Sequence, residues 1–222
     1  MKTYIVVPAY NEERTIVSVI RGLKKEGYDN IIVIDDGSKD RTYKLVSKEN
    51  VILLHHVFNR GLGAALGTGM RAAIEEDAVI IVTFDADGQH NPKDIRRLTE
   101  QIKKGNDVVI GSRLLDTKGM PWYRVVQNFI GNIVTYLLFG VWTTDSQSGL
   151  RAFSRNAAQK IRIKTNKMEV SSEIIGEIGR NKLKFKEVPI KPIYTKYSLS
   201  KGQSLLVGIK TFLKLVLRRI MG

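Results

Sequence analysis

The stretch Ala78-Val79-Ile80-Ile81-Val82-Thr83-Phe84-Asp85-Ala86-Asp87-Gly88-Gln89-His90 joins an apolar run to a cluster of polar side chains. The run from Ala78 to Phe84 predicts a buried strand. Side chains two positions apart point the same way on an extended chain, so Asp85 and Asp87 converge if the strand continues through them. Two carboxylates with open coordination positions favour Mg²⁺ or Mn²⁺, which take further ligands from water and substrate phosphates. The alternative is an ordinary turn in which Asp and Gly end the strand.

Two more apolar runs end in polar loops. Residues 3–13 read T-Y-I-V-V-P-A-Y-N-E-E, and residues 30–38 read N-I-I-V-I-D-D-G-S. Ligands of open α/β sheets bind outside the carboxyl ends of the strands, so these loops are predicted to meet around one ligand. There Asp36 would accept hydrogen bonds from a nucleoside and Tyr10 would pack against its base. The alternative is that both loops are only helix caps and turns.

The rest of the chain alternates between helical and extended patterns. Helices are predicted at residues 12–26, 41–48, 61–76 and 92–104, and strands at residues 51–57 and 108–111. This alternation predicts an α/β fold with a mostly parallel central sheet and helices on both faces. The glycines of Asn59-Arg60-Gly61-Leu62-Gly63 are consistent with a helix start, and we assign this segment no catalytic role.

The composition fits a single main domain. The chain has 222 residues, 43% of them hydrophobic, which is enough for one sizeable core. It has no cysteine, which excludes disulfides and thiol chemistry. Its first residues lack the charged and then apolar pattern of an export leader, so the cytoplasm is the expected location. The net charge of +14 fits nucleic acid, an anionic membrane surface or solvated faces, but the sequence has no recognisable nucleic-acid-binding motif.

Two apolar stretches favour a membrane surface. Residues 204–221 place Lys210, Lys214 and Arg218 on one face of a basic amphipathic helix, which favours lying in the interface over spanning the bilayer. Residues 122–140 carry aromatic residues near both ends, as interfacial segments do, and the spacing of Arg124, Gln127, Asn128 and Asn132 predicts a polar stripe that faces inward. The alternative is a buried core helix for residues 122–140 and a terminal helix packed on its own domain for residues 204–221. We predict a catalytic domain at residues 1–201, with an interfacial helix at about 122–140, and a C-terminal appendage at residues 202–222.

The motifs, taken in order, resemble those of family 2 glycosyltransferases. V-P-A-Y-N-E, D-D-G-S, N-R-G-L-G, D-A-D-G-Q-H, G-S-R and D-S-Q-S-G-L-R follow one another between Val7 and Arg151. Within this family the chain is similar to dolichol-phosphate mannose synthases and related polyprenyl-phosphate hexosyltransferases, from Thr3 to about Lys201. The resemblance implies a GT-A fold, which is the nucleotide-diphospho-sugar transferase fold.

The resemblance also implies roles for individual residues. The nucleotide-sugar-binding positions are matched by Pro8, Tyr10, Glu12, Ile34, Asp36, Asp85 and Ala86. The metal ligands, for Mg²⁺ or Mn²⁺, are matched by Asp87 and Gln89. The positions expected to hold a lipid phosphate are matched by Arg113 and Arg124, and Asn128 stands where the family often has Ser. The usual Arg and Gly of the later loop have no clear counterpart, and Lys201 and Lys196 are expected to substitute for them. The expected catalytic residues are Asp85, Asp87 and Arg113.

The implied acceptor is a phosphate. Family 2 enzymes that extend sugars on hydroxyls carry Q-x-x-R-W, whereas residues 147–152 read Q-S-G-L-R-A and resemble the branch that binds an anionic lipid phosphate. A phosphate monoester is already negative, so its attack needs no general base. The expected reaction is inverting transfer of a hexose, with mannose favoured over glucose and N-acetylglucosamine, from a nucleotide diphosphate sugar to dolichyl or polyprenyl phosphate.

Two other functions are compatible with the sequence. One is transfer to a glycan or protein hydroxyl, with Asp145 as the general base. The other is a nucleotide-sugar or membrane-binding module without turnover. The expected reaction takes place with the protein peripheral on the cytoplasmic membrane face and without nucleic acid as a partner.

Overall fold

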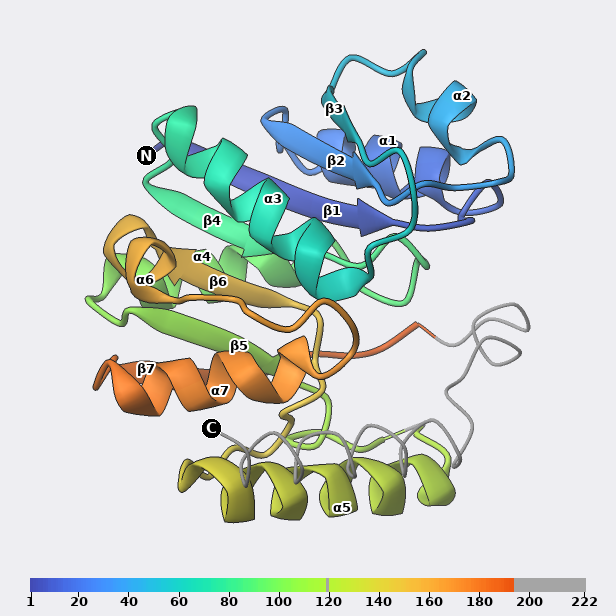
Figure 1. The fold of residues 1–222 in the computed structure, drawn as a ribbon. Helices are drawn as coiled ribbons and strands as arrows, with labels where there is room; N and C mark the ends of the chain where they lie inside the picture. Colours follow the sequence, from blue (N-terminus) through green and yellow to red (C-terminus); the bar gives the residue numbers. More distant parts are fainter. Residues whose placement is uncertain (119, 194–222) are drawn as a thin grey trace.

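A seven-stranded sheet forms the centre of the molecule, with strand order β3-β2-β1-β4-β6-β5-β7 (Figure 1). The computed structural model describes residues 1–118 and 120–193, so Lys196, Lys201 and the predicted basic terminal helix lie outside the described residues. The strands are β1 (Thr3–Ala9), β2 (Ile31–Asp35), β3 (Ile52–His55), β4 (Ile80–Thr83), β5 (Val108–Ser112), β6 (Arg151–Ser154) and β7 (Phe185–Pro189). Only β6, which lies between β4 and β5, is antiparallel to its neighbours.

Helices cover both faces of the sheet. They are α1 (Ile16–Lys25), α2 (Thr42–Val46), α3 (Leu62–Glu75), α4 (Asp94–Lys103), α5 (Trp122–Phe139), α6 (Arg155–Lys160) and α7 (Val170–Arg180). One core contains residues of α1, α2 and α4, and the other contains residues of α3, α6 and α7. Along β1, Ile5 and Val7 enter the first core while Tyr4 and Val6 enter the second. Strands buried on both faces explain why these runs are continuously apolar, and the predicted α/β fold is confirmed.

The structure differs from the sequence-based expectation in some details. Helix α1 begins at Ile16 because the residues before it form a turn, in which Asn11 has φ 55° and the Thr15 and Ile16 amides both donate to Glu12 O. Strands β6 and β7 were not predicted as strands. Both carry charged residues, R-A-F-S in β6 and F-K-E-V-P in β7, so neither has the continuous apolar run that predicted the other strands.

Helix α5 lies outside both helical layers and contacts α7 (Figure 1). A side chain at Gly176 would collide with the Phe139 ring, and one at Gly179 would collide with Val141, so glycines on α7 allow the end of α5 to approach closely. Within residues 1–118 and 120–193, no helix combines the length and the apolar character needed to cross a membrane.

Candidate active site

The loops that follow β1 and β2 bind each other. The Asn11 amide donates to Ser38 Oγ (2.9 Å), the Glu12 amide donates to Thr42 Oγ1 (2.8 Å), and the Lys39 amide donates to Asn11 Oδ1 (2.8 Å). Polar residues at the carboxyl ends of neighbouring strands therefore fix the two loops against each other. Tyr10 stays 40% exposed at this rim, where its ring is available to stack on a ligand.

Three of the predicted nucleotide-sugar-binding residues lie in the core. Pro8 of β1 is in register with Ile34 of β2, and both are buried. Ala86 is buried as well, at 3% exposure. Their side chains pack against protein, so any contact that these residues make with a nucleotide uses the backbone.

Asp36 is buried and organises the loop before α3. Its Oδ1 accepts from His56 Nδ1 (2.7 Å) and the Arg60 amide (3.0 Å), and its Oδ2 accepts from the Gly61 amide (2.7 Å). A carboxylate that accepts several N–H bonds is held in one orientation. Asp36 thus fixes the segment N-R-G-L-G, for which we predicted no role.

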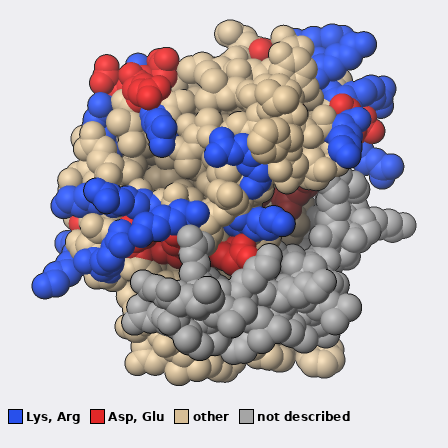
Figure 2. Space-filling model, in the orientation of Figure 1, with Lys and Arg blue, Asp and Glu red and all other residues tan. Residues whose placement is uncertain are grey.

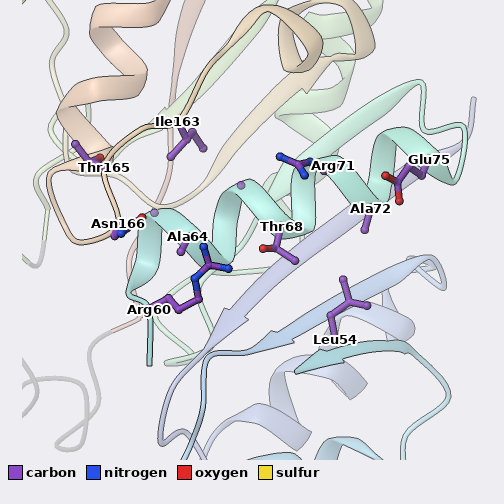
Figure 3. A pocket seen from close by; sticks show the side chains of 12 residues that line it. Leu54, Arg60, Ala64, Thr68, Arg71, Ala72, Glu75, Ile163, Thr165 and Asn166 are labelled. Carbon is purple, nitrogen blue, oxygen red and sulfur yellow. The ribbon is translucent and has the colours of Figure 1, made fainter. Parts of the chain in front are cut away.

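A cavity of about 350 Å³ runs along the outer side of α3 (Figure 3). Arg60, Thr68 and Arg71 of α3 and its preceding loop lie on one side, and Thr165 and Asn166 lie across from them. His56 links this cavity to Asp36, since its imidazole Nε2 contacts Thr68 Oγ1 at 3.0 Å while its Nδ1 binds Asp36.

Asp85 and His90 form the inner part of the third loop. Asp85 Oδ2 accepts from His90 Nε2 at 3.0 Å, and the His90 ring packs edge-on against Phe84. Burial acts to raise the pKa of Asp85, but the hydrogen bond from His90 and the charges of His90, Arg113 and Arg151 outweigh it and keep this pKa below its ordinary value. Asp85 is therefore ionised at neutral pH, with 36% of its side chain exposed.

Asp87 and Gln89 contact each other beside Asp85. Asp87 Oδ1 accepts from the Gln89 amide (2.9 Å), and Asp87 Oδ2 accepts from Gln89 Nε2 (2.6 Å). Burial raises the pKa of Asp87, and the negative charges of Asp85 and Glu12 add to this effect. The carboxylates of Asp85, Asp87 and Glu12 therefore create a negative potential that favours a bound cation.

These residues fit a hard divalent cation. Within the described part of the chain no group of three or more His, Cys, Asp or Glu side chains is arranged to hold a metal. The carboxylate of Asp87 and the amide oxygen that Gln89 presents after rotation of its amide are oxygen donors of the kind that Mg²⁺ and Mn²⁺ accept. Such ions complete their coordination with water and substrate phosphates, so a site with few protein ligands suits them.

Gly149 packs directly against the Asp85 carboxylate. A Cβ at this position would collide with all three atoms of the Asp85 carboxylate group. Thr83 Oγ1 donates to Gly149 O at 2.7 Å, and Thr83 pairs with Arg151 in the antiparallel β4–β6 ladder. The S-G-L-R segment at residues 148–151 therefore packs against the D-A-D segment at residues 85–87.

Arg113 follows β5 and is bound to Asp145. Asp145 Oδ2 accepts from the Arg113 amide (2.9 Å) and from Nε (2.7 Å), and Oδ1 accepts from Nη2 (2.8 Å). Asp145 is fully buried, and the Arg113 side chain is 18% exposed. A carboxylate occupied by a forked pair is not placed to take a proton from a substrate, so the structure does not support Asp145 as a general base.

Arg151 is an internal residue. Its Nη2 donates to the carbonyls of Ser146 (2.7 Å) and Ser171 (3.1 Å), and the residue is 2% exposed. Burial lowers the pKa of Arg151 to about 10. Arg151 therefore holds two backbone segments together inside the protein.

Helix α5 presents polar residues to the protein and apolar residues outward. Asn132 and Thr135 are its buried residues, and Arg124 and Asn128 are half-buried. The exposed large apolar residues of this helix are Trp122, Tyr123, Val126, Phe129, Ile130, Ile133, Tyr136 and Leu137. The predicted inward polar stripe is therefore present, and a helix buried in the core is ruled out.

Comparison with known proteins now identifies the family. Residues 4–162 match the sequence model described as glycosyl transferase family 2. This protein is a family 2 glycosyltransferase. An uncharacterised protein of Methanocaldococcus jannaschii is 50% identical over 223 residues, which cover 98% of this glycosyltransferase and 92% of the relative. A protein of Methanococcus voltae named UDP-N-acetylglucosamine–dolichyl-phosphate N-acetylglucosaminyltransferase is 41% identical over 240 residues, with 98% and 96% coverage.

A solved structure confirms the GT-A fold of this glycosyltransferase. Glucosyl-3-phosphoglycerate synthase from Mycobacterium tuberculosis, in complex with Mn²⁺, uridine diphosphate and phosphoglyceric acid, aligns with a TM-score of 0.76 at 19% identity. The alignment covers 98% of this chain and 78% of that chain. The fold is thus shared at low sequence identity.

Sequence reasoning missed several residues that build the site. His56, His90 and Gly149 hold or border the carboxylates of Asp36 and Asp85, yet we assigned none of them a role. His90 lies within the D-A-D-G-Q-H motif, so its position was itself a signal. His56 and Gly149 meet their partners only through long-range contacts, for which the sequence contains no local pattern.

Proposed function

We propose that this glycosyltransferase moves a sugar from a nucleotide diphosphate sugar to dolichyl or polyprenyl phosphate. The observation that carries the proposal is the position of Arg113, which is locked on Asp145 and lies close enough to Asp85 to lower its pKa. A fixed guanidinium beside the donor carboxylates is suited to a phosphate acceptor, because a guanidinium has five N–H donors in fixed directions and the Asp145 carboxylate takes two of them.

The donor end is formed by the loops after β1, β2 and β4. Tyr10, Glu12 and Asp36 are proposed to bind the nucleotide, with backbone groups of Pro8, Ile34 and Ala86. Asp85, ionised and held by His90, is proposed to contact the sugar nucleotide directly. Asp87 and Gln89 would hold Mg²⁺ or Mn²⁺, which when bound neutralises charge on the departing diphosphate.

The acceptor end needs to bind and orient an anion. A phosphate monoester attacks with charge that it already carries, so Arg113, Arg124 and Asn128 are proposed to align it without removing a proton. Lys196 and Lys201, outside the described residues, are proposed to assist. Direct attack from the side opposite the diphosphate inverts the anomeric centre, and the stereochemistry of the product tests this step.

The donor sugar remains to be chosen by experiment. The motif residues contact features common to all nucleotide sugars, and discrimination depends on hydroxyl contacts elsewhere. We expected mannose from the motifs. The name of the Methanococcus voltae relative, which is similar over nearly the whole chain, makes UDP-N-acetylglucosamine the first donor to test.

Peripheral attachment to the membrane is part of the proposal. The outward apolar face of α5 includes Ile130 at 54% and Leu137 at 75% exposure, which is an arrangement suited to the headgroup boundary. Figure 2 shows Lys and Arg side chains gathered over α6, α7 and the segment between them. The exposed cations of this region are Lys160, Arg162, Lys164, Lys167, Arg180 and Lys182. They favour an anionic surface.

The test is a transfer assay with radiolabelled UDP-N-acetylglucosamine, GDP-mannose or UDP-glucose, a short polyprenyl phosphate and Mn²⁺. We expect a butanol-extractable sugar lipid with one of the donors, and its loss when a chelator is added. The β-linked product from an α-linked donor would establish inversion. Absence of lipid product with every donor, together with transfer to a soluble glycan or peptide hydroxyl, would reject the proposal.

A further inference from the structure

Glu187 of β7 holds the loop that leads from α5 to β6. Its Oε1 accepts from Thr143 Oγ1 (2.7 Å), the Thr144 amide (2.8 Å) and Thr144 Oγ1 (2.8 Å). Its Oε2 lies 3.1 Å from the same Thr144 amide. An ionised carboxylate that gathers this many donors is a strong and directional anchor.

The anchored residues adjoin Asp145. Thr144 precedes it in the chain, and Thr144 Oγ1 lies 2.6 Å from Ser112 Oγ, on the residue before Arg113. The loop and the end of β5 are therefore joined twice, once through Ser112 and Thr144 and once through the forked pair of Arg113 and Asp145.

Helix α5 holds the same loop from the other side. Asn132 Nδ2 donates to Thr144 O, and Asn132 Oδ1 accepts from the Ser146 amide at 2.8 Å. Asp145 thus lies between two backbone groups that are bound to one buried asparagine. With the loop fixed by β7 and by α5, the Asp145 carboxylate has one orientation, and so does the guanidinium that it binds.

We infer that Glu187 is a positioning residue for the acceptor phosphate, acting through Thr144 and Asp145 to aim the Arg113 guanidinium. The inference rests on the proposed function, in which Arg113 contacts that phosphate. Glu187 touches neither substrate. Because guanidinium recognition of phosphate depends on the direction of its N–H groups, a small rotation of Arg113 weakens acceptor binding while the donor loops on β1, β2 and β4 stay in place.

The full-length variant Glu187→Ala tests this inference. We expect at least a tenfold rise in acceptor KM, with the donor affinity in Mn²⁺ unchanged within about twofold. Glu187→Gln keeps an oxygen for the three donors at Oε1, so its acceptor KM should fall between those of Glu187→Ala and the wild type. Thr144→Val removes the hydroxyl that links Glu187 to Ser112, and it should raise acceptor KM independently.

Glu173→Ala is the matched control. Glu173 likewise holds a loop, by accepting from the Lys164 amide (2.9 Å), the Thr165 amide (2.9 Å) and Thr165 Oγ1, but this loop contacts the start of α3, where the Gly63 amide donates to Asn166 O. Loss of either carboxylate should lower the unfolding temperature. Only the loss of Glu187 should change acceptor KM, so a general loss of stability is separated from positioning.

A second readout does not depend on activity. In the wild type the Arg113 Nε–H, bound to Asp145, should give a slowly exchanging NMR signal, and Glu187→Ala should speed its exchange while Glu173→Ala should not. Unchanged acceptor KM and unchanged Arg113 exchange in Glu187→Ala would overturn the inference. A wild type that makes no sugar lipid with any donor refutes the proposed function instead, and the exchange measurement still decides whether Glu187 orients Arg113.

Discussion

The Asp85 carboxylate interacts with a residue of its own loop and with residues of two other segments. His90 binds one oxygen, Gly149 lies against the group from below, and Arg113 contributes a positive charge. Asp87, two residues away, has its pKa shifted in the opposite direction by burial and by Asp85. Two carboxylates of one motif thus have different charge environments, which gives them different tasks in the proposed reaction.

Asp87→Asn should abolish most metal-dependent transfer. Removal of one charged ligand leaves the diphosphate poorly neutralised, and we expect kcat/KM to fall by about 10²- to 10³-fold. Initial rates at several Mn²⁺ concentrations measure this effect. The control is Asp77→Asn, since Asp77 is exposed and paired with Arg155 far from the site. Equal rates for Asp87→Asn and the wild type would contradict the assignment.

Gly149→Ala should displace Asp85. The added methyl group overlaps the carboxylate, so we expect at least a tenfold fall in kcat/KM and a loss of roughly 1–3 kcal/mol in the free energy of unfolding. Denaturant unfolding and initial rates measure the two effects. Gly67→Ala is the control, because nothing lies within 4 Å of a Cβ on this residue of α3. It should gain roughly 0.5–1 kcal/mol and keep its activity. If Gly149→Ala behaves like Gly67→Ala, the role given to Gly149 is wrong.

At the scale of elements, α5 differs from an ordinary surface helix in which face is polar, because an ordinary one buries its apolar residues and exposes its polar ones. Its buried residues, Asn132 and Thr135, are polar, and they bind the loop before β6 and Ser172 of α7. Most of its large apolar residues face outward. A polar helix interface is specific because each buried polar group needs its partner, whereas the outward apolar face gains free energy only by contact with a further apolar phase.

The double variant Ile130→Ser/Leu137→Ser should weaken binding to lipid vesicles. Each Leu or Ile side chain contributes roughly 1.5–3 kcal/mol when buried, so the partition coefficient should fall at least tenfold. Co-sedimentation with anionic vesicles measures this change, and the unfolding temperature should stay constant because both side chains are exposed. Val57→Ser, at an 89% exposed position after β3, is the matched control. Unchanged sedimentation of the double variant would exclude α5 as a membrane contact.

At the scale of the whole molecule, donor binding should stabilise the fold because the site joins loops from several strands. A ligand at about 100 times its Kd adds about 2.7 kcal/mol to the free energy of unfolding. For a chain of this length that free energy corresponds to a rise of about 5–11 °C in Tm. Thermal shifts with UDP-N-acetylglucosamine, GDP-mannose and UDP-glucose, each with and without Mn²⁺, measure the effect. We expect one donor to stand out and its shift to need the metal. A shift that is equal for all donors and insensitive to Mn²⁺ would contradict the proposed site.

Sequence reasoning predicted much of the fold and part of the site. The strands β1, β2 and β4 were predicted because residues buried on both faces of a parallel sheet form continuous apolar runs. The inward stripe of α5 was predicted from the spacing of its polar residues. The antiparallel β6 and the edge strand β7 were missed, since charged residues interrupt their apolar character. The base role considered for Asp145 was wrong, because nothing near Asp145 in sequence indicates that Arg113 occupies it.

The sequence by itself determined the layered α/β architecture, the family, and the carboxylates offered at the ends of the strands. These follow from local patterns, in which each residue acts on neighbours a few positions away. Only the tertiary structure decided which charges are paired, because Arg113 and Asp145 are 32 residues apart and Thr143 and Glu187 are 44 apart. Such pairs form when packing brings their segments together, and the orientation of Arg113 is set by that packing.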